Sequence, residues 1–195
     1  MTQSTFMKPI NNKKFNPVAD FYDWIETFLY ALALVVLMFT FLFRFVTVDG
    51  ESMTHTLKDK DYLIISDLDY KPKTGDIIVF DAMKYNGGVK PLIKRVIATE
   101  GQTVDIDFDT WQVYVDGVLL DEPYVRRETT GRMEDGDRAD MYPITVDKNC
   151  VFVMGDNRNG SRDSRMSNVD QIDTRYILGR VLVRFFPFEA AGKVN

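Results

Sequence analysis

Residues 27–43 form an uninterrupted apolar run that constrains the fold more than any other part of this sequence. From Thr27 to Phe43 there is no charged residue, and Glu26 and Arg44 bracket the run. About 17–22 helical residues, at ~1.5 Å rise each, cross the ~30 Å hydrocarbon core of a bilayer. The run is apolar on every face, which favours a membrane span over the buried core helix of a soluble domain. We therefore expect a transmembrane anchor over residues 24–46.

The flanks of this run argue against a cleavable signal peptide. Such a peptide has an apolar region of ~7–15 residues followed by a small-x-small cleavage site, whereas Arg44 and Phe45 follow here. Three lysines among residues 8–14 precede the run. By the positive-inside rule, residues 1–23 stay in the cytoplasm and residues 47–195 lie on the extracytoplasmic face of the cell membrane, in a single-pass protein.

The chain after residue 46 has the pattern of a β domain. Short apolar or alternating runs bounded by turn-forming residues predict strands, and Asp116-Gly117 between two such runs predicts a hairpin. No helical period of useful length follows residue 50, and the polar segment 121–148 is expected to be a loop-rich excursion. We expect a folded antiparallel sheet or barrel-like domain. The predicted strands cover 62–65, 77–80, 95–98, 104–108, 111–115, 118–120, 151–154 and 176–186.

Composition narrows the function classes. A net charge of −5 and a pI of about 5.0 argue against a nucleic-acid partner. One cysteine, Cys150, excludes an intrachain disulfide, and one histidine, His55, excludes zinc sites built from several His or Cys ligands. A Ser–His–Asp triad would have to use His55. We expect no metal and no cofactor.

The first cluster suited to hydrolytic chemistry surrounds Ser52. The serine lies between Gly50 and the apolar Met53 in the segment 48–57. Glycine lets the backbone approach a ligand closely, which suits a nucleophile. An ordinary turn has the same composition, so both readings stay open from these residues alone.

The second cluster places Lys94 inside an apolar strand. Successive strand residues face opposite sides, so Lys94 shares its face with the apolar Leu92 and Val96. Loss of hydration lowers the pKa of a lysine, and a neutral amine is a competent general base near pH 7–8. The alternative is an edge-strand lysine with its ammonium group in water.

The third cluster is the segment 155–165, which follows an apolar run but contains no apolar side chain. Asp163 and Arg165 can pair there, and the Ser161 hydroxyl can orient an amine. A solvated charged turn is the alternative.

Taken in order, these clusters resemble bacterial type I signal peptidase, or leader peptidase, in its short, single-span Gram-positive form. After the apolar run come Ser-Met-x-x-Thr-Leu (52–57), Gly-Asp-Ile-x-Val-Phe (75–80), Lys-Arg-Val-Ile (94–97) and Gly-Asp-Asn-Arg-x-x-Ser-x-Asp-Ser-Arg (155–165). The likeness extends to about residue 187, nearly the whole chain, and its last motif is the most specific.

The resemblance implies a serine endopeptidase with a Ser–Lys dyad that needs no imidazole. Ser52 matches the nucleophile and Lys94 the general base. Ser161 matches the hydroxyl that orients the lysine, and Asp163 and Arg165 match a supporting pair. The Ser52 N–H would be one oxyanion donor. Gly50 stands where Gram-negative relatives have a serine that donates to the oxyanion, so the second donor stays unassigned.

The resemblance also implies the substrates and their surroundings. These would be exported preproteins with signal peptides, cut after small-x-small sequences such as Ala-x-Ala, beside the lipid bilayer and near the secretion translocon. Shallow apolar pockets would admit small side chains only. The implied lining is Val46, Val48, Met53, Leu57, Leu92 and Ile93.

Two departures from the family pattern bear on substrate range. His55 stands where the family usually has Pro, which would fix the turn after the nucleophile, and the turn 98–102 keeps only Gly101 of the family's glycine- and proline-rich sequence. A paralogue dedicated to a few pilus-like surface proteins therefore stays open, as does a non-catalytic assembly factor. A Ser–Lys self-cleaving regulator ranks below both, because it needs a DNA-binding module where this chain has an apolar span.

Overall fold

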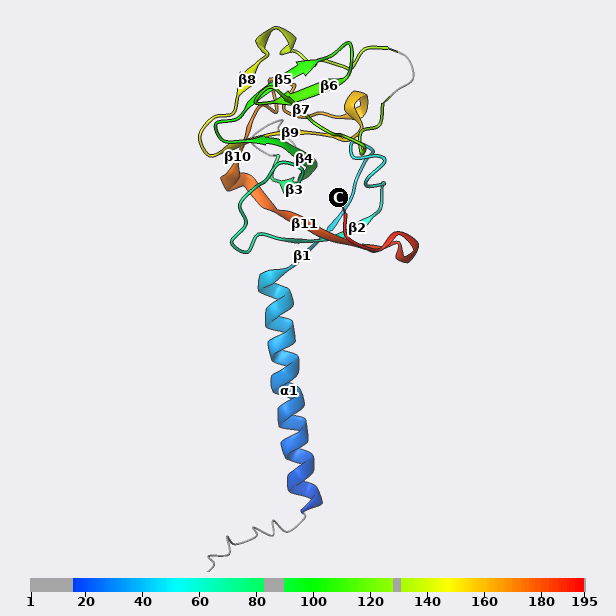
Figure 1. The fold of residues 1–195 in the computed structure, drawn as a ribbon. Helices are drawn as coiled ribbons and strands as arrows, with labels where there is room; N and C mark the ends of the chain where they lie inside the picture. Colours follow the sequence, from blue (N-terminus) through cyan, green and yellow to red (C-terminus); the bar gives the residue numbers. More distant parts are fainter. Residues whose placement is uncertain (1–15, 83–89, 128–130, 195) are drawn as a thin grey trace, which may run out of the picture. The chain divides into compact units, whose positions relative to one another are not determined.

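The structure is a computed structural model that describes residues 16–82, 90–127 and 131–194 (Figure 1). The chain divides near residue 40 into two compact units, an N-terminal helical unit and a larger unit that begins at Phe41. The larger unit contains all of the β structure that the described residues form. It therefore holds every candidate site residue.

In the described residues, the N-terminal unit consists of most of the helix α1 (Pro17–Leu42), up to Thr40. Proline suits the first helical position, where its missing N–H has no helical partner to lose, and Asn16 Oδ1 accepts a hydrogen bond from Val18 N at 3.2 Å. The stretch Pro17–Thr40 is long and apolar enough to cross a membrane by length and composition, and none of its most apolar window is buried.

The boundaries of α1 differ from those expected from sequence. The helix begins at Pro17 and ends at Leu42, whereas the anchor expected from sequence covers residues 24–46. The next residues form the strand β1 (Arg44–Thr47), which pairs with β2 (Tyr62–Ser66). Phe45 and Val46 continue the apolar run, but apolar composition fits a strand as well as a helix, and pairing with β2 decides between them.

Seven strands form the main sheet, in the order β1-β2-β11-β3-β4-β9-β10. All of its neighbouring strands pair antiparallel. This confirms the prediction of an antiparallel β domain. The remaining strands of this sheet are β3 (Ile77–Phe80), β4 (Leu92–Thr99), β9 (Cys150–Met154), β10 (Ile172–Asp173) and β11 (Ile177–Phe186).

A second sheet has four strands in the order β7-β6-β5-β8. They are β5 (Thr103–Asp107), β6 (Gln112–Val115), β7 (Val118–Leu119) and β8 (Ile144–Thr145). The predicted hairpin is confirmed, because Asp116 and Gly117 both have positive φ, as a tight two-residue turn between β6 and β7 requires. Figure 1 shows β5, β6 and β7 together at one end of the larger unit, with β11 and β2 side by side at the other.

Apolar side chains cover both faces of the main sheet. Ile77 and Val79 of β3 pack in one buried cluster, while Ile78 and Phe80, on the opposite face, pack in another. A third cluster joins the two sheets through residues such as Phe152 and Val113. The short 3₁₀ helices are η1 (Ala139–Met141), η2 (Arg158–Gly160), η3 (Thr174–Tyr176) and η4 (Phe188–Ala190).

Candidate active site

The turn that carries Ser52 lies between β1 and β2 and is tied to the loop 155–165 that follows β9. The carbonyl oxygen of Ser52 accepts a hydrogen bond from Asn157 N at 3.0 Å. Asn157 Nδ2 also donates to the carbonyl oxygen of Glu51 at 3.1 Å. Two segments that are far apart in sequence therefore hold the Ser52 hydroxyl in place.

Lys94 approaches this hydroxyl from β4. The side chain is only 1% exposed, and its Nζ lies 2.7 Å from Ser52 Oγ. Nζ also donates to the carbonyl oxygen of Ile93 at 2.9 Å. The edge-strand alternative, with the ammonium group in water, does not describe this residue. The structure instead brings a buried amine into hydrogen-bond contact with a serine hydroxyl.

Burial makes Lys94 a weaker base than an ordinary lysine. Loss of hydration lowers the pKa of Lys94 to about 8, and the positive charge of Arg165 acts in the same direction. Asp163 and Asp156 oppose the shift because their negative charges favour the ammonium form. A substantial neutral fraction is therefore present close to physiological pH, as a general base requires.

Asp163 and Arg165 form a buried bidentate ion pair. Arg165 Nε donates to Asp163 Oδ1 at 2.8 Å and Nη2 donates to Oδ2 at 2.9 Å. Gly155 N adds a third hydrogen bond to Oδ2 at 2.9 Å. Burial by itself raises the pKa of Asp163, but Arg165 outweighs it, so the pKa of this carboxyl lies below its ordinary range. The pair stays charged near Lys94.

Ser161 is buried, but it does not make the hydrogen bond to Lys94 that the resemblance implies. Within the described part of the chain, Ser161 Oγ has no hydrogen-bond partner, because the Lys94 amine is directed to Ser52 and Ile93. The Ser161 hydroxyl still lies close enough to Asp163 to favour its charged form.

Gly155 allows the loop 155–165 to close on the Ser52 turn. A Cβ at this position would lie 2.2 Å from Ser161 Oγ and 2.5 Å from the carbonyl oxygen of Ser52. Both separations are far below van der Waals contact. The glycine is therefore required by the close approach of the two segments.

A cleft of about 270 Å³ opens beside Ser52 and Lys94. Of the six residues that the resemblance implies as lining, Leu57 is not in the cleft. It is fully buried in the same core cluster as Met53, whose carbonyl oxygen accepts a hydrogen bond from Leu57 N at 2.8 Å. The five others line the cleft, namely Val46, Val48, Met53, Leu92 and Ile93.

Gly50 also lines this cleft, with a φ of +106° that favours glycine. Its backbone N–H donates to Asp59 Oδ1 at 2.9 Å. This N–H is therefore already bonded and does not serve as a second oxyanion donor in this conformation. At the rim of the cleft an exposed ion pair joins Lys90 Nζ and Asp49 Oδ2 at 2.5 Å.

A second buried ion pair, Arg95–Asp156, adjoins the site and was not predicted from the sequence. Arg95 Nε donates to Asp156 Oδ1 at 2.9 Å, and its Nη2 donates to Oδ2 at 2.8 Å. Thr56 Oγ1 also donates to Asp156. Both residues belong to the motifs described above, since Arg95 follows Lys94 and Asp156 follows Gly155. Their pairing depends on the contact between β4 and β9 and is not visible from spacing.

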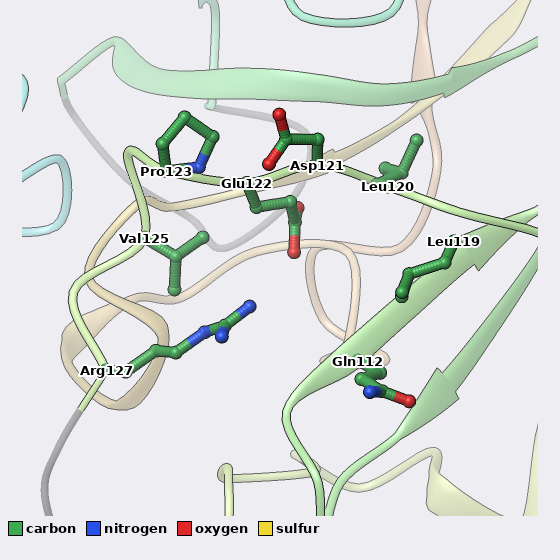
Figure 2. Close-up of a pocket in the computed structure, with 8 residues that line it drawn as sticks. All are labelled: Gln112, Leu119, Leu120, Asp121, Glu122, Pro123, Val125 and Arg127. Atoms are coloured by element: carbon green, nitrogen blue, oxygen red, sulfur yellow. The ribbon is translucent and has the colours of Figure 1, made fainter.

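A larger hollow of about 480 Å³ lies between the β6–β7 hairpin and the segment 120–127. Figure 2 shows Glu122 and Arg127 pointing toward its interior. Glu122 is not free to react there, because it forms a buried bidentate pair with Arg158, at 2.5 and 3.1 Å. Neither Ser52 nor Lys94 lines this hollow, so the smaller cleft is the candidate reaction centre. Among the described residues, no group of three or more His, Cys, Asp or Glu side chains is placed to hold a metal ion.

Comparisons with known proteins identify the family of this chain. The profile of the family described as signal peptidase, peptidase S26, matches residues 21–186. Signal peptidase I of Bacillus amyloliquefaciens is 35% identical over 182 residues, which is 89% of this chain and 92% of that protein. Signal peptidase IB of Staphylococcus aureus is 32% identical over 179 residues, or 85% of this chain and 90% of that protein.

A crystal structure of a signal peptidase I from Enterococcus faecalis is also similar. It is 27% identical, covers 57% of this chain and 97% of its own, and has a TM-score of 0.44. The sequence matches extend over most of α1, both sheets and all three clusters that carry the candidate site.

Proposed function

This chain belongs to the signal peptidase family, peptidase S26, and on that premise we propose that it removes signal peptides with a Ser52–Lys94 dyad. It is a serine endopeptidase, a hydrolase of peptide bonds, and its substrates are preproteins that carry signal peptides. The observation that supports the dyad is the 2.7 Å separation between the buried Lys94 Nζ and Ser52 Oγ.

The proposed reaction begins with the neutral form of Lys94. Its lone pair takes the proton of the Ser52 hydroxyl as Oγ attacks the scissile carbonyl carbon, which gives a tetrahedral intermediate. The Ser52 N–H donates to the oxyanion. Lys94 then protonates the departing amine as the C–N bond breaks, and the acyl-enzyme remains.

Deacylation repeats the sequence with water in place of Ser52. Lys94, neutral again, takes a proton from the water that attacks the ester carbonyl, and it returns that proton to Ser52 Oγ when the ester breaks. A pKa of about 8 suits both directions of transfer, because neither form of the amine is rare near neutral pH. The charges of Asp163 and Arg165 act on the pKa of Lys94, and the Ser161 hydroxyl favours the charged form of Asp163.

The cleft supports cleavage after small-x-small sequences. An extended peptide places alternate side chains on the same side, so the two small residues face the floor and the residue between them faces away. Val46, Val48 and Ile93 line the cleft, and their apolar side chains would accept small residues such as Ala. β1 is the end strand of the main sheet, and its unpaired edge offers backbone hydrogen bonds to such a peptide.

The helix α1 is proposed as a single membrane anchor, with residues 1–23 in the cytoplasm and the β domain outside. Length and composition support the span, and the lysines of residues 8–14 support the orientation. One residue separates α1 from β1, so the tether between anchor and peptidase domain is short. A peptidase tethered in this way meets signal peptides in the bilayer at raised local concentration, beside the translocon that exports them.

The test uses the full-length protein in detergent and a preprotein with an Ala-x-Ala site. We expect a single cut after the second Ala, located by mass spectrometry, and no cut with Ser52→Ala or Lys94→Ala. Lys148→Ala, which removes an exposed lysine from the turn before β9, is the matched control and should cut normally. Cleavage that survives Lys94→Ala would overturn the dyad. No cleavage of several unrelated precursors would favour the dedicated paralogue or the assembly factor.

A further inference from the structure

A segment of the loop-rich excursion, residues 132–137, connects the second sheet to the candidate site. Met133 anchors this segment, because its side chain is 1% exposed in the core of the second sheet and its N–H donates to the carbonyl oxygen of Phe108 at 2.8 Å. Just before it, Trp111 Nε1 donates to the carbonyl oxygen of Gly131 at 3.0 Å. The segment therefore has a fixed base on the second sheet.

The other side of the segment bonds to the loop 155–165. Arg165 Nη1 donates to the carbonyl oxygen of Glu134 at 2.6 Å. Glu134 N donates to Asn159 Oδ1 at 2.8 Å. Arg165 Nη2 also donates to the carbonyl oxygen of Arg158 at 2.5 Å. The guanidinium that pairs with Asp163 is thus held by two backbone carbonyls, one of which comes from the segment 132–137.

Gly136 sets how closely the segment approaches Arg165. Its φ is +67°, and a Cβ there would lie 2.5 Å from the Arg165 carbonyl oxygen and 3.0 Å from the Arg165 carbonyl carbon. Both atoms are backbone, so a rotamer change does not relieve the contact. Any side chain at this position has to push the segment and Arg165 apart.

We propose that residues 132–137 are a positioning element for the dyad, in which Gly136 is the positioning residue that lets the second sheet hold Arg165 against Asp163. The inference rests on the proposed Ser52–Lys94 chemistry and gives the second sheet a part in it. The segment touches neither Ser52 nor Lys94 in any described contact; it acts through the Arg165–Asp163 pair.

Displacement of Arg165 would raise the pKa of Lys94. The charges that act on the Lys94 amine are the carboxylates of Asp163 and Asp156 and the guanidinium of Arg165. If Arg165 is displaced, the Asp163 carboxylate is less compensated and favours the ammonium form of Lys94. The neutral base then becomes available only at higher pH. A merely structural role for the segment would change thermal stability without changing this titration.

The experiment compares Gly136→Ala with Gly101→Ala in the full-length protein in detergent. Gly101 also has a positive φ, +79°, but a Cβ there meets nothing within 4 Å, so the control carries the backbone strain without the clash. We expect Gly136→Ala to lower kcat/KM at pH 8 by roughly tenfold or more and to move the acidic limb of the pH profile upward. Gly101→Ala should keep the parent's profile.

A second variant keeps the inference testable if Gly136→Ala does not fold. Asn159→Ala removes the acceptor of the Glu134 N–H, leaves the Arg165 contacts themselves intact, and should shift the acidic limb in the same direction by a smaller amount. Parent-like pH profiles in Asn159→Ala and in any folded Gly136→Ala, whatever their Tm values, would overturn the inference. If the proposed dyad is wrong, the result is a different one: activity persists in Lys94→Ala.

Discussion

The backbone N–H of Asn157 donates to the carbonyl oxygen of Ser52 at 3.0 Å, so the loop after β9 and the nucleophile turn are one hydrogen-bonded unit. Gly155 begins that loop, and Asp163 accepts the hydrogen bond of its N–H. A change that separates the loop from the turn therefore moves the nucleophile and the supporting ion pair together.

Gly155→Ala tests this unit. The new Cβ would collide with Ser161 and with the Ser52 carbonyl, and overpacking of this kind typically costs ~1–3 kcal/mol of stability. We expect kcat/KM to fall by roughly 10²-fold, because an ångström of misplacement at a reacting atom is enough for such a loss. Steady-state kinetics and thermal melts measure both effects. Gly101→Ala is the control: it has a positive φ, so it carries backbone strain, but its Cβ meets open space and it should keep the parent's kcat/KM. Equal losses of kcat/KM in the two variants would contradict the close approach.

Activity should rise with pH through about 8. Lys94 has to be neutral to accept the Ser52 proton, and burial lowers its pKa to about 8. kcat/KM measured from pH 6 to 9 should follow a single ionisation with a midpoint near that value. Lys94→Arg, which stays charged over this range, should lose activity by roughly 10²-fold or more. A profile that is flat between pH 6 and 9 would contradict Lys94 as the base.

The same ionisation predicts how stability depends on pH. The pKa of Lys94 is lower in the folded chain than in the unfolded chain, where a lysine titrates at ~10.4. Between these two values the unfolded chain binds more protons, so the free energy of unfolding rises with pH from about 8 upward and is constant with respect to this group below that window. Thermal melts of the parent and Lys94→Met at pH 7 to 10 isolate the effect. The Tm of the parent should rise relative to that of the variant, and parallel curves would contradict a buried amine.

Asp163→Asn should have two separable consequences. It leaves the Arg165 guanidinium buried without its counter-charge, which costs about 3–5 kcal/mol. It also removes the charge that raises the pKa of Lys94 most, so the acidic limb of the kcat/KM profile should move to lower pH. Chemical denaturation and the pH–rate profile measure the two.

Asp67→Asn is the matched control for the stability change, because Asp67 pairs with Arg44 at 3.3 Å on the surface, where such pairs contribute about 0–1 kcal/mol. Equal stability losses in the two variants would contradict the buried character of the Asp163 pair.

Much of this architecture follows from local patterns in the sequence. Alternation and turn residues locate the strands, and Ile77–Phe80 is both the predicted strand and the observed β3. The apolar neighbours of Lys94 predict its loss of hydration, because a strand faces neighbours two residues away. The order of the motifs predicts the family. Each of these features is encoded within a few residues.

The features that sequence reasoning missed depend on contacts between distant segments. The end of α1 at Leu42 is set by the pairing of β1 with β2 and not by composition. Leu57 is apolar enough to line the cleft, but it is fully buried in the core cluster that also contains Met53. The hydrogen bond from Arg165 to Glu134 joins two loops whose spacing carries no signal. In each case the tertiary partner decides the outcome, and no local rule identifies it.

The position of β11 in the main sheet determines when the two halves of the site can assemble during synthesis of the chain. The last strand of the chain lies between β2 and β3, so it separates the pair β1–β2, which flanks the Ser52 turn, from the pair β3–β4, which carries Lys94. Until the ribosome has added residues 177–186, no strand hydrogen bonds join these two halves. The nascent chain therefore carries a nucleophile and a base that the sheet has not yet brought together. The sheet contacts that join these two halves therefore form only after β11 has been made.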